Sequence, residues 1–255
     1  MRANIMALVA GSYLAAAVAA PGWTAPANVK AAVATSAARS PDNVKLDAGR
    51  KPAELLAFLG LERGMRVLDL FGGNRYWAEI IAPAVGPNGQ VIVWQPNQFL
   101  NDKRRAEFAT FAGRQKNAAL FASPFQSPAL APAAYDFALM NLDYHDVYWQ
   151  SSERGIPRME PDAWLSVLYA TLKPGGIIGV IDHAAAPGGD TRAVVEALHR
   201  IDPAVVRADF ERAGFVVEAQ SDLLRNPADD HSINVFDEKI RGKTDRFVFK
   251  FRKPR

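Results

Sequence analysis

Hydrophobic and polar positions follow a repeating order along the 255-residue chain, in which short apolar runs alternate with longer amphipathic stretches. In KPAELLAFLGL, which starts at Lys51, the spacing of leucine and phenylalanine and the early proline predict a helix. The next segment, MRVLDLF, is a short apolar run between Gly64 and Gly72 and predicts a strand buried on both faces. The same alternation continues, with helices predicted at 76–85, 102–113 and 190–199 and in PDAWLSVLYATL and AVVRADFERAGF, and strands at 118–122 and in QVIVWQP, YDFALMNLD, KPGGIIGVIDH, FVVEAQS and DRFVFKFRK.

This order of elements predicts an α/β fold with a doubly wound, mostly parallel sheet, because strands separated by helices are joined by crossovers. The last two strands, FVVEAQS and DRFVFKFRK, have no long helical pattern between them, so we expect an antiparallel C-terminal pair. A hydrophobic content of 49% is sufficient for one medium-sized domain with a large core.

The N-terminus carries the pattern of a secretory signal peptide. Arg2 is followed by an apolar run over residues 5–18, and Ala17 and Ala19 form a small-x-small triplet with Val18. We therefore predict a signal peptide at 1–19 and export to the periplasm or the medium. A short membrane anchor is the alternative, but the alanine-rich run is too short and too weakly apolar to span a bilayer, so no stable membrane insertion is expected after cleavage.

The segment after the signal peptide, residues 20–40, is rich in Ala, Pro, Thr and Ser without periodicity, and we expect a flexible leader there. The folded domain is then predicted at 41–255. The 30 basic and 27 acidic residues are spread along the chain, which does not favour nucleic-acid binding. The absence of cysteine excludes disulfides, thiol catalysis and thiolate metal sites.

Four segments in this order resemble class I S-adenosylmethionine-dependent methyltransferases. They are VLDLFGGNRYWAE at the first strand and turn, AAYDFALMNLDYHDVYW at the fourth strand, LKPGGIIGVIDH at the fifth, and the RAGF turn before the final pair. More narrowly, DAGRKP, YHDVYW and SDLLRNPADDHSINVFDEKIRGKTDRFVFKFRKP are similar to segments shared by a family of exported bacterial predicted methyltransferases. The resemblance covers about residues 47–254.

The resemblance implies a seven-stranded sheet with S-adenosylmethionine lying across the carboxyl ends of the first strands, where open α/β sheets bind ligands. It matches Asp69 to the acidic residue of the first strand and Gly73 to the central glycine of the turn. Phe71 and Arg75 stand where the family has glycines, and Gln95 stands where a carboxylate for the ribose is expected. The cofactor-binding residues that it implies are Asp69, Phe71, Gly72, Gly73, Asn74, Tyr76, Gln95, Asn97 and Phe125.

The segment LDYHDVYW places several polar side chains just beyond the fourth strand, at the edge that faces the transferred methyl group in this fold. His145 is our candidate base because its unperturbed pKa of about 6.5 lies near working pH. Asp143 or Asp146 would orient it, and Tyr144 lies beside them. The alternative is that these residues pack against the core and bond the loop backbone.

A metal site is the other possibility at these strand ends. His145, Asp146 and His183 could converge, with His231 or Asp230 from the RNPADDHS segment, to give nitrogen and oxygen ligands. The spacing matches no recognised metal signature, so no metal ligand is assigned, and His199 is interpreted as structural. Two irregular stretches, 150–161 and 226–244, are expected to cover the pocket.

Three functions remain open from the sequence, one of which is metal-assisted hydrolytic or binding chemistry through the histidines. The first is a methyltransferase acting on a small or envelope-associated molecule, and the second is a non-catalytic binding or scaffolding protein that keeps the fold with an altered cofactor turn. Export, Phe71, Arg75 and the missing carboxylate favour the second function. The acidic residue Asp69 and the polar strand ends favour the first.

Overall fold

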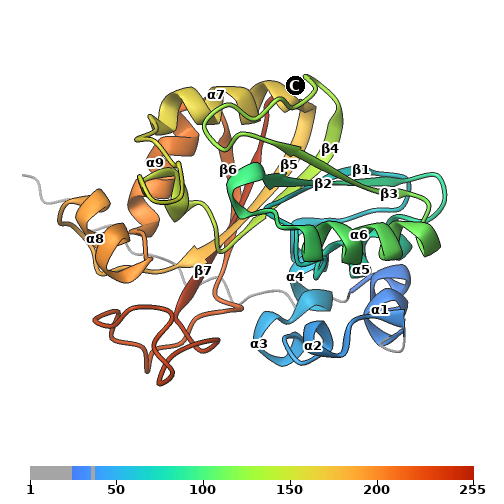
Figure 1. Ribbon diagram of the computed structural model, residues 1–255, viewed down its shortest axis with the longest axis horizontal. Coiled ribbons are helices and arrows are strands. Elements are labelled where there is room, and N and C mark those ends of the chain that lie inside the picture. Colours follow the sequence, from blue (N-terminus) through green and yellow to red (C-terminus); the bar gives the residue numbers. More distant parts are fainter. Residues whose placement is uncertain (1–24, 36–37) are drawn as a thin grey trace, which may run out of the picture.

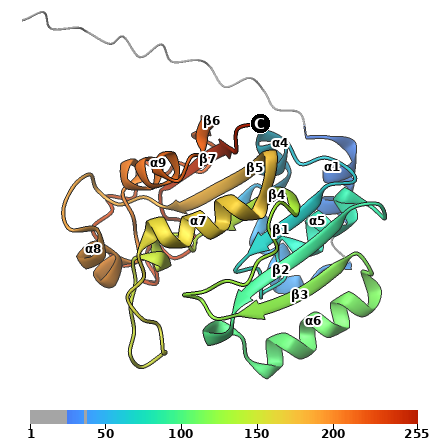
Figure 2. The same ribbon diagram turned by 90° about the horizontal axis from the view of Figure 1, so that it is seen from above.

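A computed structural model describes residues 25–35 and 38–255, so the predicted signal peptide lies outside the described residues. The described chain forms a seven-stranded sheet with helices on both faces (Figures 1 and 2). The strands are β1 (Arg66–Leu70), β2 (Gln90–Pro96), β3 (Ala118–Ser123), β4 (Tyr135–Asn141), β5 (Leu172–His183), β6 (Val216–Ser221) and β7 (Arg246–Arg252). The helices are α1 (Ala27–Ala34), α2 (Pro41–Val44), α3 (Asp47–Arg50), α4 (Pro52–Leu59), α5 (Ala78–Val85), α6 (Asp102–Arg114), α7 (Pro161–Thr171), α8 (Thr191–Leu198) and α9 (Pro203–Arg212), with 3₁₀ turns η2 (Asn97–Phe99) and η3 (His145–Val147).

The strand order is β3-β2-β1-β4-β5-β7-β6, with β1 to β5 parallel and β7 antiparallel to both β5 and β6. The predicted fold is thereby confirmed, including the antiparallel C-terminal pair. Leu70 at the end of β1 is level with Trp94 of β2 and Met140 of β4. The carboxyl ends of these three strands therefore meet at one edge of the sheet.

Successive residues of each strand point to opposite faces, and this alternation builds two cores. Val67 packs on the side covered by α4, α5 and α6, whereas Leu68 packs on the side covered by α7 and α9 (Figure 1). Both residues are fully buried. Because both faces are covered, the parallel strands read as continuous apolar runs in the sequence.

Part of the segment expected to be a flexible leader is helical. Within residues 20–40, α1 packs against α4 and α5, and its Val29 is 0% exposed. The side-chain amide of Asn28 donates a hydrogen bond of 2.9 Å to the carbonyl of Ala84 in α5. Alanine-rich sequence has high helix propensity, and the buried positions supply the packing that a helix of this length requires. The folded part therefore begins before Pro41.

Replacing Val29 by Ala is expected to destabilise the protein by about 2 kcal/mol, because two buried methyl groups are lost and a small cavity remains. Val216→Ala is the matched control, since Val216 is 49% exposed, and it should change stability by less than about 0.5 kcal/mol. Denaturant unfolding of both variants measures the difference. Equal stability would contradict the packing of α1 in the folded protein.

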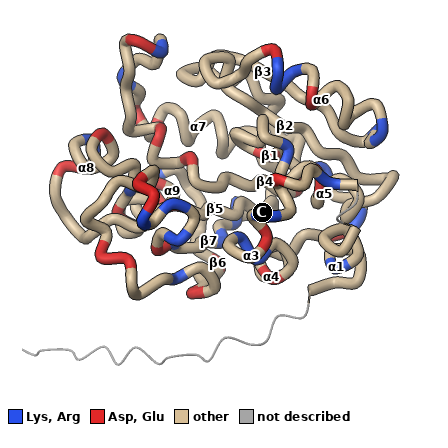
Figure 3. The backbone as a smooth tube through the Cα atoms, turned by 60° about the horizontal axis from the view of Figure 1, so that its bottom comes forward, with Lys and Arg blue, Asp and Glu red and all other residues tan. Residues whose placement is uncertain are grey.

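No helix within residues 25–35 and 38–255 is both long and apolar enough to cross a membrane. Acidic and basic residues are interspersed over the elements of the described chain (Figure 3). This mixture agrees with the small charge excess of the sequence.

Candidate functional site

A cavity of about 350 Å³ lies at the sheet edge where β1, β2 and β4 end. In the sheet, β1 has β2 on one side and β4 on the other, so the strand order reverses direction at β1. The cavity therefore lies at this switch point. Its volume is at the lower end of the range for small-molecule sites. It is lined by Arg50, Asp69, Leu70, Phe71, Gly72, Asn74, Trp77, Gln95, Phe99, Arg104, Asn141, Leu142, Asp143, Asp146 and Phe236.

Asp69 is a buried carboxyl group without a partner. It is 1% exposed, and neither of its side-chain oxygens has a hydrogen-bond partner among the described residues. Burial raises its pKa to about 8, and the charge of Arg50 counteracts this only in part. A Cβ at Gly72 would overlap the Asp69 carboxyl group, so only glycine fits at that position of the turn. The site thus holds a buried carboxyl group whose hydrogen-bond partner has to come from outside the described residues.

Arg50 is the last residue of α3 and lines the same cavity. Its guanidinium stacks over the ring of Tyr76, 4.2 Å from the ring centroid. It is partly buried and makes no hydrogen bond or ion pair with any described residue. Burial lowers its pKa, which nearby Tyr76, Asp143 and Asp69 oppose. The cavity therefore contains one guanidinium with all its hydrogen-bond donors available. The sequence interpretation missed Arg50, although it lies within DAGRKP.

The turn after β1 keeps the cavity open despite its two bulky residues. Phe71 and Arg75 adopt positive φ values of 58° and 66°, the region that favours glycine. The Phe71 ring packs edge-on against Trp94 and Phe125, at centroid distances of 5.2 and 5.1 Å, and forms part of the cavity wall. Arg75 points elsewhere, pairing with Glu107 at 2.7 Å. Neither side chain fills the space next to Asp69.

Gln95 is the penultimate residue of β2 and stands where the family resemblance implies a carboxylate. Its side chain is 2% exposed, and its Oε1 accepts a 2.7 Å hydrogen bond from the backbone N–H of Gly73. A Cβ at Gly73 would overlap this side chain, so the glycine permits the contact. Gln95 therefore fixes the turn as well as lining the cavity.

The other residues implied for cofactor binding divide into two groups. Asn74 lines the cavity and accepts a hydrogen bond from the backbone N–H of Tyr76. Tyr76 is fully buried and donates to Asp47 at 2.8 Å, so it supports Arg50 rather than reaching the cavity. Phe125 is fully buried and packs edge-on against the ring of Phe71. Gly73, Tyr76, Asn97 and Phe125 are not among the residues that line the cavity.

His145 is buried in η3 and held by Asp182, the penultimate residue of β5. Asp182 Oδ2 accepts a 2.9 Å hydrogen bond from the backbone N–H of His145, and its Oδ1 lies 2.8 Å from His145 Nδ1. Burial lowers the pKa of His145, but the facing carboxylates of Asp182 and Asp146 outweigh burial and raise it to about 9. The reasoning from an unperturbed pKa is therefore wrong for this ring. His145 is also absent from the residues lining the cavity.

The predicted neighbours of His145 point in different directions. Asp143 and Asp146 line the cavity, and burial together with Asp146 raises the pKa of Asp143. The Asp143 carboxyl group makes no hydrogen bond with any described residue. Tyr144 lies on the other side, fully buried, and donates a 2.8 Å hydrogen bond to Asp209 of α9. Tyr144 thus packs the core, and the two aspartates reach the cavity.

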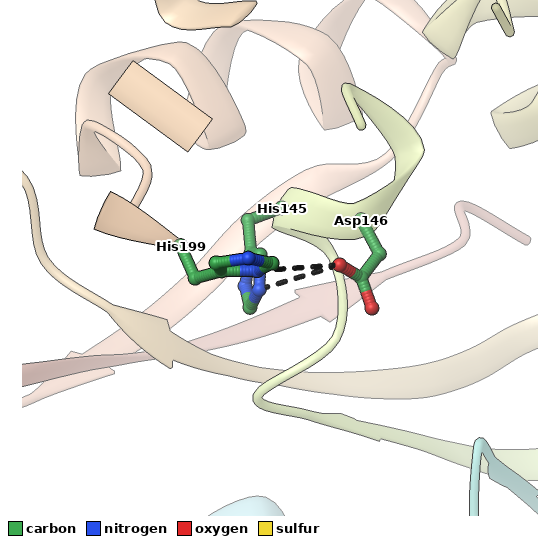
Figure 4. Close-up of side chains that lie close together, drawn as sticks. All are labelled: His145, Asp146 and His199. Atoms are coloured by element: carbon green, nitrogen blue, oxygen red, sulfur yellow. Dashed lines mark ion pairs between the residues drawn. The ribbon is translucent and has the colours of Figure 1, made fainter. Parts of the chain in front are cut away.

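The histidine that joins His145 and Asp146 is His199, not the expected His183 (Figure 4). Asp146 Oδ1 lies 3.5 Å from His145 Nε2 and 3.9 Å from His199 Nδ1. The ring of His183 instead contacts Thr244 Oγ1 at 2.6 Å, and His231 contacts Asp245 at 3.0 Å. The interpretation of His199 as a purely structural residue overlooked this cluster.

The two irregular stretches border different hollows. The 226–244 segment reaches the cavity through Phe236, which is 58% exposed and packs against His199 at a ring distance of 4.9 Å. The 150–161 segment instead borders a wider, more open hollow of about 1590 Å³ with the start of α8. The expectation of a cover over the pocket is therefore met by the later segment.

Solved structures with the same fold are S-adenosylmethionine-dependent methyltransferases and related proteins. One from Aquifex aeolicus is 18% identical, with a TM-score of 0.57 over 88% of this chain and 98% of its own. One from Mesorhizobium loti is 17% identical, with a TM-score of 0.57 over 81% and 99%. A [4+2]-cyclase is 17% identical, with a TM-score of 0.57 over 81% of both chains. No protein-family model and no curated protein matches the sequence. At these identities the likeness concerns the fold.

Proposed function

We propose that this chain is an S-adenosylmethionine-dependent methyltransferase acting on a small or envelope-associated molecule, with the cofactor bound in the 350 Å³ cavity. The observation that carries the proposal is the unpartnered Asp69 carboxyl group, buried in the same cavity as the unpartnered Arg50 guanidinium. A ligand with both cationic and carboxylate groups would satisfy the two at once.

S-adenosylmethionine has this charge pattern, since it carries an ammonium group, a sulfonium group and a carboxylate. Arg50 would hold the carboxylate through its free donors, and Asp69 would face the cationic groups. Asn74 and Gln95 add neutral hydrogen-bonding groups at the rim. The residues present therefore fit the cofactor, with an amide in place of the usual carboxylate for the ribose.

When bound, the cofactor supplies an electrophilic methyl group on its sulfonium sulfur. The chain contributes positioning and the exclusion of water, because Phe71, Phe99 and Phe236 form apolar parts of the wall. Asp143 lines the cavity without a hydrogen-bond partner, so its carboxylate is available to accept a proton from the methyl acceptor. His145 lies behind this wall and acts through Asp146.

The second candidate is a non-catalytic binding protein, and Gln95 favours it. Its Oε1 already accepts the Gly73 N–H, which reduces what it offers to a ribose. The [4+2]-cyclase among the structural neighbours illustrates that a protein of this fold can have an activity other than methyl transfer.

Isothermal titration of the purified chain with S-adenosylmethionine and S-adenosylhomocysteine tests the proposal. We expect saturable binding of both, and at least a tenfold loss of affinity in Arg50→Met, because a charge-assisted bond to the carboxylate is worth about 1.5–3 kcal/mol. Arg75→Met is the matched control, since Arg75 pairs with Glu107 away from the cavity. Absence of binding at millimolar ligand, or equal losses in both variants, would favour the non-catalytic alternative.

We also propose that the protein is exported and belongs with the exported bacterial proteins that share its DAGRKP and YHDVYW segments. The support is the N-terminal pattern of Arg2, an apolar run and a small-x-small triplet. N-terminal sequencing of protein recovered from the periplasm or medium should begin at Ala20. Recovery only from the cytoplasm with Met1 intact would contradict export.

A further inference from the structure

We propose that His145, Asp146 and His199 form a binding site for a divalent transition-metal ion, with Zn²⁺ the first candidate. The three residues come from η3 and from the end of α8, and their side chains point toward one another (Figure 4). Two imidazoles and one carboxylate are a ligand set that suits Zn²⁺ or Fe²⁺ rather than Mg²⁺ or Ca²⁺, which prefer oxygen ligands. The site does not depend on the proposed cofactor.

The distances between the ligand atoms are close to those that such an ion requires. One ligand atom from each residue can be chosen so that all lie within 4.8 Å of one another. The two contacts to Asp146 Oδ1 are 3.5 Å from His145 Nε2 and 3.9 Å from His199 Nδ1. Ligands about 2.0–2.1 Å from a tetrahedral ion lie roughly 3.4 Å apart, so the two contacts to Asp146 need only a small contraction and the two imidazole nitrogens, within 4.8 Å of each other, need a larger one.

Asp182 orients His145 for this role. It is 0% exposed, and it accepts hydrogen bonds from the backbone N–H groups of His145 and His183. Because an ionised carboxylate only accepts hydrogen bonds, Nδ1 of His145 carries the proton that faces Asp182. Nε2 faces Asp146, and a bound ion would displace the proton that the raised pKa of His145 keeps on this nitrogen. Most metal-binding histidines have such a carboxylate or carbonyl behind the ring.

Three carboxyl groups lie at or next to the cluster. Asp143, Asp146 and Asp182 gather at the ends of β4 and β5, and among the described residues their ion-pair partners are histidines alone, with His145 as the cation. Buried carboxylates are ordinarily paired with a cation or bound to a metal. The protonated His145 balances one of these three carboxylates, and a divalent ion in place of its proton would balance two.

The position of the site also suggests what it would do. Asp146 lines the cavity, and Phe236 covers the outer side of His199. Three protein ligands leave at least one coordination position available to water or a bound molecule. An ion here could coordinate an oxygen atom of a molecule in the cavity, which would bring the substrate class toward hydroxyl- or carboxylate-bearing compounds.

Metal titration of the chain tests the site, with Co²⁺ as a spectroscopic probe and Zn²⁺ as the competitor. After removal of metal by a chelator and dialysis, we expect one equivalent of Co²⁺ to give visible absorption bands that Zn²⁺ abolishes. His199→Ala should weaken Co²⁺ binding at least tenfold, and His231→Ala, whose ring lies against Asp245 outside the cluster, should not.

Asp146→Asn is a second variant, which keeps the test decisive if His199→Ala does not fold. It should also weaken binding at least tenfold. The proposal is overturned if the wild-type protein gives no stoichiometric Co²⁺ bands, or if the folded variants bind Co²⁺ as tightly as the wild type. Because the assay contains no S-adenosylmethionine, its failure leaves the proposed methyltransferase function standing, and failure of cofactor binding leaves the metal site standing.

Discussion

Replacing Asp229 with alanine is expected to lower the free energy of unfolding by about 3–5 kcal/mol, because it removes one partner of a buried ion pair. Arg200 is 0% exposed, and Asp229 accepts two hydrogen bonds from it, at 2.8 and 3.0 Å. The remaining donors of Arg200 bond the carbonyl groups of Ala184 and Ile233. Without the carboxylate, the guanidinium is buried with its charge unbalanced.

The matched control is Arg158→Ala, which breaks the pair between Arg158 and Glu160 on the surface. The side chains of that pair are 61% and 69% exposed, so the loss should be under about 1 kcal/mol. Denaturant unfolding measures both values, provided that the variants and the wild type share the same dependence of unfolding free energy on denaturant concentration. A loss of less than 1 kcal/mol for Asp229→Ala would mean that this pair does not anchor the 226–244 segment. That segment carries Phe236 to the cavity, so the same variant should also weaken ligand binding.

The sheet could be predicted from the sequence because the burial of its strands determines where apolar residues stand along the chain. Parallel strands covered on both faces, such as RVLDL and the apolar part of LKPGGIIGVIDH, can only be apolar, and glycine or proline turns bound them. The period-two pattern of RFVFKFR likewise indicated the final antiparallel strand. Local sequence is sufficient for such elements because the two solvent-excluded faces constrain every residue.

The leader helix and Arg50 could not be predicted in the same way. The helix α1 has a weak amphipathic pattern, and its stability comes from α4 and α5, which are distant in sequence. Arg50 ends the short helix α3, directly before Lys51 with its positive φ of 45°, and its guanidinium lines the cavity while stacked on Tyr76. Such contacts join segments about 25 residues apart, and the hydrophobic periodicity of a single segment cannot predict them.

The histidine cluster is a similar case. His183 lies next to Asp182 at the end of β5, which made it the natural partner of His145 in the sequence interpretation. In the structure the His183 ring does lie near His145, with ring centroids 6.1 Å apart, but its Nδ1 is 2.6 Å from Thr244 Oγ1 rather than next to Asp146. His199 approaches instead because its φ of 51° ends α8 and redirects the chain. The contact of His183 with Thr244 and the approach of His199 both join segments distant in sequence, so no local pattern separates the two histidines.

Asp69→Asn is expected to stabilise the protein at neutral and alkaline pH while it abolishes cofactor binding. The folded pKa of Asp69 is raised to about 8, well above the ordinary value of 3.8, so between these pH values the unfolded chain has lost a proton that the folded chain retains. Stability therefore falls as the pH rises through this window, by up to about 1.4 kcal/mol per pH unit. Asparagine has no such proton to lose.

Urea unfolding of the wild type and Asp69→Asn at pH 5, 6, 7 and 8 measures this effect. The free energy of unfolding of the variant should rise relative to that of the wild type at each pH step. This relative increase should end above about pH 8, where the carboxyl group of the folded wild type also ionises. Asp222→Asn, at an exposed position, is the control and should follow the wild-type profile. Parallel profiles for the wild type and Asp69→Asn would mean that Asp69 already has a partner in the folded protein. A stabilised variant without affinity for S-adenosylmethionine would instead mean that this carboxyl group is kept for its ligand at a cost in stability.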